Sequence, residues 1–93
     1  MIITSEEDLG TYGAIDCGGF IANFMLAAES LGIASIAQAA LSMHASLICE
    51  HFSLPPDRRL ICGISFGYKD KAHPANAFRT SRAPLSELVA FAS

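Results

Sequence analysis

The sequence predicts a small α+β domain, in which helices pack on a short sheet. Two observations support this class. Small and bulky apolar residues mix over about residues 16–31 and a glycine follows, which is typical of a buried helix. Residues 58–68 form a nearly continuous apolar run, which is typical of a strand covered on both faces. A chain of 93 residues has room for one domain at most.

The first third is predicted to be a loop followed by a long helix. Residues 1–13 read as a loop or ragged start, with two glycines near its end. Asp16 is the expected N-cap, because its carboxylate can accept hydrogen bonds from the unpaired amides of a first turn. The helix should then run to about Leu31 and stop at Gly32.

This helix combines a thin surface with bulky apolar side chains. The thin positions are Gly18, Gly19, Ala22, Ala27 and Ala28, and the bulky ones are Phe20, Phe24, Met25, Leu26 and Leu31. Small residues allow a second backbone to come close, and the helix is apolar nearly all round. The pattern suits a central helix that packs against a symmetry mate.

The remaining elements are shorter. Residues 33–36 favour a strand or extended segment, and residues 38–41 a connection. Ser42 is the expected cap of a second helix over residues 43–52, and the Leu-Pro-Pro-Asp run at 54–57 marks a turn. The strand over 58–68 is then followed by an irregular stretch.

The end of the chain carries little structural signal. Residues 69–84 are expected to be irregular, and residues 85–91 to form either a short helix capped near Ser86 or an extended arm.

Composition favours association with other protein surface. The chain is 52% hydrophobic and only 16% charged, below the roughly 25% of typical soluble domains. An oligomer, or contact with further parts of a larger domain, is therefore expected. The net charge of −3 argues against nucleic acid as a partner. Polar residues and Gly32 interrupt the apolar stretch over 17–43, so no membrane span is expected.

The cysteines indicate a reducing compartment. Cys17, Cys49 and Cys62 are odd in number, widely spaced and surrounded by apolar residues, which predicts buried reduced thiols. The start of the chain turns acidic at once and lacks the basic region of a signal peptide. The expected location is cytoplasmic.

Neither a metal site nor a nucleophilic triad is predicted. His44 and His51 are two helical turns apart, and Cys49 projects in a different direction from His51. Ser65 has no Gly-x-Ser-x-Gly context, so no catalytic side chain is assigned.

The last third offers the clearest binding signal. Between residues 60 and 84, four cations stand against one carboxylate, and Arg79 and Arg82 lie three residues apart before a proline. A guanidinium presents several donors in a fixed fork that suits phosphate or carboxylate. Two solvated surface arginines are the alternative reading of the same pair.

The run Cys62-Gly-Ile-Ser-Phe-Gly-Tyr68, together with Asn76-Ala-Phe-Arg-Thr-Ser-Arg-Ala-Pro-Leu85, resembles the C-terminal part of the FMN-dependent nitroreductase family. The resemblance extends from about residue 9 to residue 91. It implies a nitroreductase-like fold with a small mixed sheet and an interface helix that supports a homodimer. Residues 1–93 are then one partial domain, its C-terminal half, and the N-terminal half of the family domain is absent.

The resemblance also implies the cofactor-binding residues. Arg79 and Arg82 would lie beside the phosphate end of FMN, with Thr80 and Ser81 as further donors. Backbone amides of Gln38, Ala39 and Ala40 would face the flavin ring edge. Tyr68 is expected to cap the core, with contact to the flavin neighbourhood as the alternative. Asn76 is expected to position the arginine tail as a turn residue and not as a ligand.

The activity implied is that of an FMN-dependent NAD(P)H oxidoreductase. Hydride passes to the flavin, and a nitroaromatic, quinone or similar acceptor is then reduced, with the cofactor doing the redox chemistry. The alternative is a truncated, non-catalytic α+β module for dimerisation or ligand binding. The sequence does not identify the electron acceptor or distinguish NADH from NADPH.

Overall fold

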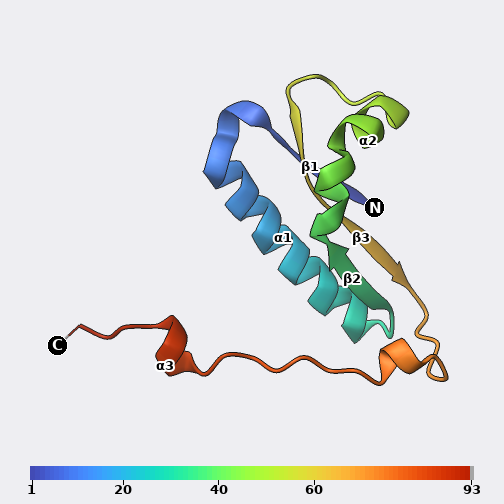
Figure 1. Cartoon of the computed structure of the whole chain (residues 1–93), viewed down its shortest axis with the longest axis vertical. Coiled ribbons are helices and arrows are strands. Elements are labelled where there is room, and N and C mark those ends of the chain that lie inside the picture. Colours follow the sequence, from blue (N-terminus) through green and yellow to red (C-terminus); the bar gives the residue numbers. More distant parts are fainter. Residues whose placement is uncertain (93) are drawn as a thin grey trace.

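The computed structural model describes residues 1–92 and confirms the α+β class (Figure 1). The strands are β1 (Ile2–Glu6), β2 (Ala34–Gln38) and β3 (Arg58–Gly67). The helices are α1 (Gly10–Ser30), α2 (Ala45–His51) and α3 (Leu85–Leu88), with short 3-10 helices η1 (Glu7–Leu9), η2 (Ala39–His44) and η3 (Pro74–Asn76).

The three strands form one sheet in the order β1-β3-β2. Both pairings are antiparallel, with Ile3 opposite Cys62 and Ile36 opposite Ser65. The expected mixed sheet is therefore wrong for residues 1–92, because β3 occupies the centre and runs against both neighbours. The expected loop over 1–13 is also wrong at its start, where β1 pairs with β3.

Helix α1 begins at Gly10, six residues before the expected cap Asp16, which lies inside the helix. The early start depends on Gly13, because a Cβ there would collide with the Ser5 hydroxyl and lie 2.7 Å from the Leu9 Cβ. The missing side chain lets the first turn of α1 lie directly against β1. Gly13 is thus a contact residue between helix and strand.

The end of α1 agrees with the prediction. Gly32 has φ +74°, a left-handed conformation that glycine adopts without steric cost. Its amide donates to the Glu29 carbonyl at 2.9 Å, and the Ile33 amide donates to the Ala28 carbonyl at 2.9 Å. This pair of bonds is a Schellman motif, which satisfies the last carbonyls of the helix.

The core lies between α1 and the sheet. Ile3, Cys62 and Ile64 form the buried cluster, against which Cys17, Ile21, Phe24 and Ile61 pack. Phe24 also meets Phe66 edge-on at a centroid distance of 5.6 Å, which fixes the second half of α1 over β3.

Side chains alternate along β3, so Gly63 faces away from α1. Leu41 of η2 lies against this glycine, where a Cβ would collide with it. Helices α1 and η2–α2 therefore flank the strands, as Figure 1 shows.

The middle elements agree with the prediction in kind and differ in detail. The extended segment predicted over 33–36 is β2, and the helix predicted over 43–52 is the shorter α2 preceded by η2. Ser42 does not cap α2, because it lies within η2 and its hydroxyl donates to the Ala39 carbonyl at 2.8 Å. The proline turn is present, with the Arg58 amide donating to the Pro55 carbonyl at 3.1 Å.

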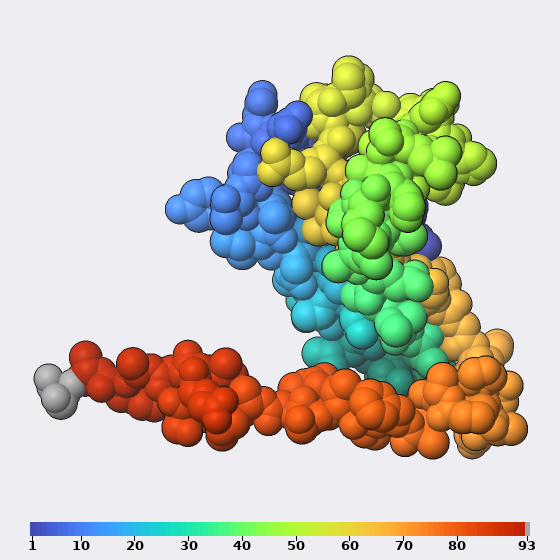
Figure 2. Space-filling model, in the orientation of Figure 1, coloured from blue at the N-terminus to red at the C-terminus, as the bar shows by residue number. Residues whose placement is uncertain are grey.

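Residues 69–92 form a segment, here called the C-terminal arm, that leaves the end of β3 and extends away from residues 1–68 (Figures 1 and 2). The chain exposes 7500 Å², against about 5,200 Å² for a compact monomer of its 9.8 kDa mass. Its radius of gyration is 16.3 Å, against about 12 Å for a compact domain. Much apolar surface therefore remains uncovered.

Candidate functional site

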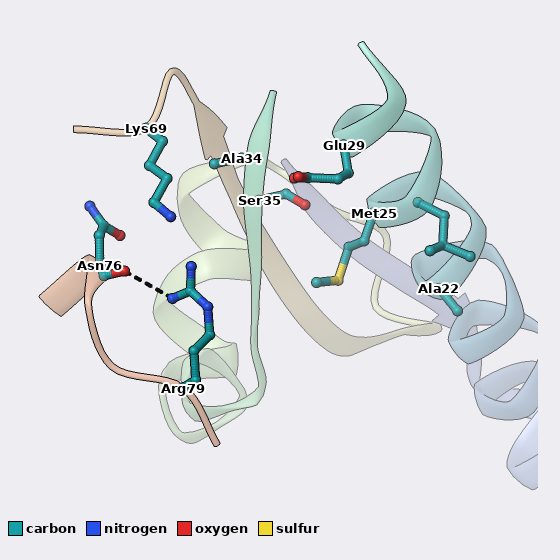
Figure 3. Close-up of a pocket in the computed structure, with 9 residues that line it drawn as sticks. Ala22, Met25, Glu29, Ala34, Ser35, Lys69, Asn76 and Arg79 are labelled. Carbon is teal, nitrogen blue, oxygen red and sulfur yellow. Dashed lines mark hydrogen bonds between the residues drawn. The ribbon is translucent and has the colours of Figure 1, made fainter. Parts of the chain in front are cut away.

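A pocket of about 630 Å³, here called the arm pocket, lies between α1, the start of β2 and the C-terminal arm (Figure 3). Its apolar wall comes from α1 and β2, and its polar groups come from both sides. The lining residues are Ala22, Met25, Leu26, Glu29, Ala34, Ser35, Lys69, Asn76 and Arg79. The pocket thus combines an apolar wall with two cations, one amide and one carboxylate.

Hydrogen bonds within the arm hold Arg79 at the pocket. The Asn76 side-chain amide donates to the Asp70 carbonyl at 2.6 Å, which closes the loop over residues 70–76. Arg79 Nη1 donates to the Asn76 carbonyl at 2.9 Å and to the Phe78 carbonyl at 2.8 Å. The expected role of Asn76 in positioning the arginine tail is therefore confirmed.

Charge is divided sharply between the arm and the remainder of the chain. Arg58 pairs with Glu6 at 3.6 Å and Arg59 with Glu7 at 3.0 Å, so the acidic start of the chain neutralises both arginines of β3. The other four cations are all in the arm: Lys69, Lys71, Arg79 and Arg82. Within residues 1–92, none of these four lies within 4.0 Å of a carboxylate oxygen.

A second pocket, here called the strand pocket, continues from the arm pocket along β2 and β3. It has a volume of about 510 Å³ and shares Ala34, Ser35, Lys69 and Asn76 with the arm pocket. Ile36 and Ser65 line its other end. Ser65 Oγ donates to Gln38 Oε1 at 2.9 Å, a diagonal contact between β3 and β2.

The structure separates the predicted site residues into three places. Arg79 lines the arm pocket, while Gln38 lies one strand length away, about 14 Å along β2. Ala39 and Ala40 begin η2, where a loop was expected. Arg82 lies farther along the arm, where its Nη1 donates to Thr80 Oγ1 at 2.6 Å and to the Ser81 carbonyl at 3.1 Å.

Tyr68 does not cap the core as expected, since it is 91% exposed and lines the strand pocket. The reason is that β3 ends at Gly67 and the chain then turns off the sheet.

Two pocket residues were missed from the sequence. Lys69 lines both pockets, and the local excess of positive charge was the signal that could have found it. Ser65 was considered only as a nucleophile, and its bond to Gln38 has no sequence signature because it crosses two strands.

The cysteines lie apart from these pockets. Cys62 is buried in the core, and its burial, followed by the nearby Cys17 thiol, raises the pKa of the Cys62 thiol above its ordinary value of 9.0. Cys17 and Cys49 are half-buried and all three are free thiols.

Within the described part of the chain, no three His, Cys, Asp or Glu side chains come together to hold a metal ion. Among residues 1–92, no helix combines the length and apolar character needed to cross a membrane.

Comparison of the sequence with known families and proteins gives a consistent match. The model of the Nitroreductase family matches residues 1–68. A 4-nitrobenzoate reductase of Nocardioides sp. (strain LMS-CY) is 33% identical over 91 residues, which is 98% of this chain and 37% of that protein. Nitroreductase NfnB of Mycolicibacterium smegmatis is 41% identical over 76 residues, which is 82% of this chain and 32% of the relative.

Solved structures agree with the sequence matches. The FMN-dependent nitroreductase NfnB from Mycobacterium smegmatis, in complex with NADPH, superposes with a TM-score of 0.88 at 35% identity, over 99% of this chain and 41% of that one. NfnB from Sphigopyxis sp. strain HMH has a TM-score of 0.92 at 23% identity, which supports the fold. This chain spans between about one third and two fifths of the length of these relatives.

Proposed function

The chain belongs to the nitroreductase family, and on this premise we propose that it functions as an FMN-dependent NAD(P)H oxidoreductase of the nitroreductase type. The acceptor would be a nitroaromatic, a quinone or a similar compound. Support comes from relatives named as 4-nitrobenzoate reductase and from a related structure described as FMN-dependent and in complex with NADPH. We propose further that residues 1–93 correspond to the C-terminal half of the family domain.

The chemistry of the donor set fits FMN. Arg79 offers guanidinium donors, and its Nη2 and Nε have no hydrogen-bond partner within residues 1–92. Arg82 lies on the same arm and would join it if the arm bends toward the pocket. These groups suit a phosphate. We assign the amides of Gln38, Ala39 and Ala40 to the flavin ring edge.

The observation that carries the proposal is the continuity of the two pockets along β2. They share four residues, and together they lead from Arg79 at one end to Ser65 at the other, whose hydroxyl donates to Gln38. A phosphate and a ring separated by an extended linker suit such a shape. When bound, FMN supplies the transfer of electrons from NAD(P)H to the acceptor. The residues of this chain bind and orient it.

We propose that the chain works in a homodimer. Large apolar side chains remain exposed on α1, with Tyr12 at 80% and Leu26 at 71%, although this helix already covers the sheet. The arm adds Phe78 at 73% and Phe91 at 82% exposed. Monomers rarely leave such patches in water, so a second copy that covers α1 and receives the arm accounts for both.

We also propose a cytoplasmic location, which the three free thiols support, because a reducing compartment keeps such thiols reduced.

The test is absorbance spectroscopy on the purified chain at known oligomeric state, with FMN added and then NADPH. Flavin absorbance should co-elute with the protein and bleach with NADPH. Arg79→Ala and Arg82→Ala should each weaken FMN binding by about tenfold to a hundredfold, since a hydrogen bond to a charged group contributes about 1.5–3 kcal/mol.

A dimeric chain that stays colourless at high FMN concentration would contradict the proposal. It would favour the non-catalytic dimerisation module instead, because the α1 surface would then function without the cofactor.

A further inference from the structure

We propose that Lys69 is a phosphate-binding residue, which acts with Arg79 to hold the phosphate end of a phosphate monoester in the arm pocket. The inference rests on the proposed function, under which this monoester is FMN. It assigns a role to a residue that neither the arginine pair nor the Gln38 segment includes.

The first argument is convergence. Lys69 and Arg79 are ten residues apart, yet both line the arm pocket. Lys69 precedes the loop over residues 70–76 and Arg79 follows it. Figure 3 shows the Lys69 ammonium and the Arg79 guanidinium pointing toward the same region, with Asn76 beside them. The loop between them is closed by the bonds from Asn76 to Asp70 and from Arg79 to Asn76. These hydrogen bonds therefore hold the backbone positions of Lys69 and Arg79 close to each other.

The second argument is charge. Lys69 and Arg79 have no carboxylate within 4.0 Å among residues 1–92, although Glu29 lines the opposite wall. A phosphate monoester carries about −1.5 to −2 charges at pH 7. Arg79 is the arginine that lines this pocket, and Lys69 supplies the second cation there. Glu29 faces the pocket from α1 and would disfavour an anion bound on that side. This places the phosphate against the arm.

The third argument is the position of Lys69 between the two pockets. Lys69 lines both pockets, so this residue lies where the arm pocket and the strand pocket meet. A phosphate held there leaves the strand pocket free for the organic part of the ligand. Lys71, by contrast, lies two residues along the same loop and lines neither pocket.

Lys71 therefore provides a matched control. Isothermal titration of the full chain with FMN, and separately with inorganic phosphate, compares Lys69→Gln, Lys71→Gln and Lys69→Arg. Lys69→Gln should weaken both ligands about three- to tenfold, because a charge-assisted contact at an open site is lost. Lys71→Gln should change the Kd less than about twofold, since it removes the same charge outside the pocket. Lys69→Arg should stay near the parent.

Salt dependence gives a second readout. The slope of log Kd against the logarithm of the salt concentration should be smaller in Lys69→Gln than in the parent. In Lys71→Gln the slope should equal that of the parent, because only Lys69→Gln removes an ammonium group that pairs with the phosphate. Equal effects of the two variants would overturn the inference, as would a chain that binds neither ligand. Phosphate binding that depends on Lys69, without FMN binding, would support the Lys69 site and contradict the proposed function instead. Both lysines are exposed, so far-UV circular dichroism should be unchanged in every variant.

Discussion

Residues 1–68 and the C-terminal arm differ in what holds them in place. The first region contains the buried core, with Ile64 only 2% exposed at its centre. In the arm, every described side chain is exposed except Asn76, which is half-buried. Its hydrogen bonds join residues at most six positions apart, as between Asn76 and Asp70.

This difference separates stability from binding. Contacts distant in sequence determine the conformation of residues 1–68, whereas the arm follows local turns and whatever surface it meets. Among residues 1–92, the cations with no carboxylate oxygen within 4.0 Å are in the arm, and the buried apolar residues are in residues 1–68. Substitutions in the two regions should therefore change different measured quantities.

The largest effect should come from Ile64→Ala. This β3 side chain is 2% exposed and belongs to the cluster that α1 covers, so its truncation leaves a cavity as well as removing apolar contact. We expect the free energy of unfolding to fall by about 3–4 kcal/mol in urea denaturation at fixed protein concentration. Phe91→Ala in the arm is the control, with a change below about 0.5 kcal/mol in the monomer, since Phe91 is 82% exposed. Similar losses in both variants would mean that the arm packs on residues 1–68 in solution.

The next prediction compares how two glycine substitutions in α1 change the free energy of unfolding. Gly13→Ala should destabilise the chain by about 1–3 kcal/mol, because the new methyl group collides with Ser5 and Leu9 across the helix–strand contact. Gly18→Ala should stabilise the monomer by up to about 1 kcal/mol, because a Cβ added there meets nothing within 4 Å and alanine favours the helix. Thermal unfolding of both variants checks the pair. If Gly13→Ala were also stabilising, the close contact between α1 and β1 would be wrong.

Gly18→Ala also tests the homodimer. In the proposed dimer a second backbone comes close to this thin surface, so the same methyl group should weaken association. Analytical ultracentrifugation should show a raised dimer Kd together with a more stable monomer. An unchanged dimer Kd would place the interface elsewhere.

The sequence predicts an element well when its signal is local. Gly32 as a helix stop and the strand over residues 58–68 are both found, since each follows from backbone freedom or from a continuous apolar run. The early start of α1 was missed, because the reason for it is the contact of Gly13 with Ser5 on another element. β1 was missed for a similar reason. Five residues ending in charge look like a loop until β3 provides the pairing and Arg58 and Arg59 provide ion pairs.

The candidate site follows the same division. Arg79 could be found from composition and resemblance, and it lines a pocket. Lys69 and Ser65 could not be assigned, because their roles depend on the fold of the arm loop and on the register of β2 against β3. Register places Ser65 opposite Ile36, one diagonal step from Gln38. No spacing in the sequence carries that information.

The smallest predicted effect is a change in how the free energy of unfolding depends on pH above 9, and it comes from a residue within residues 1–68. Burial, and then the neighbouring Cys17, raises the pKa of the Cys62 thiol above 9.0. The unfolded chain loses this proton at lower pH than the folded chain does, so the folded state binds more protons above pH 9. The contribution to stability is fully present below the unfolded pKa and is lost as pH rises through the folded pKa. Cys62→Ala should therefore flatten the decline of unfolding free energy above pH 9, although it lowers stability overall by leaving a cavity.

Ile3→Val is the matched control, because it removes a methyl group from the same cluster and retains the thiol. Urea denaturation from pH 7 to pH 11 should give parallel alkaline declines for Ile3→Val and the parent, and a shallower one for Cys62→Ala. Ionisable groups other than Cys17 and Cys62 contribute equally to all three proteins, so the difference between the curves reports Cys62 together with its interaction with Cys17. Parallel declines in all three would mean that water reaches the thiol in solution, and that α1 covers β3 less tightly than the contacts of Cys17 and Phe24 indicate.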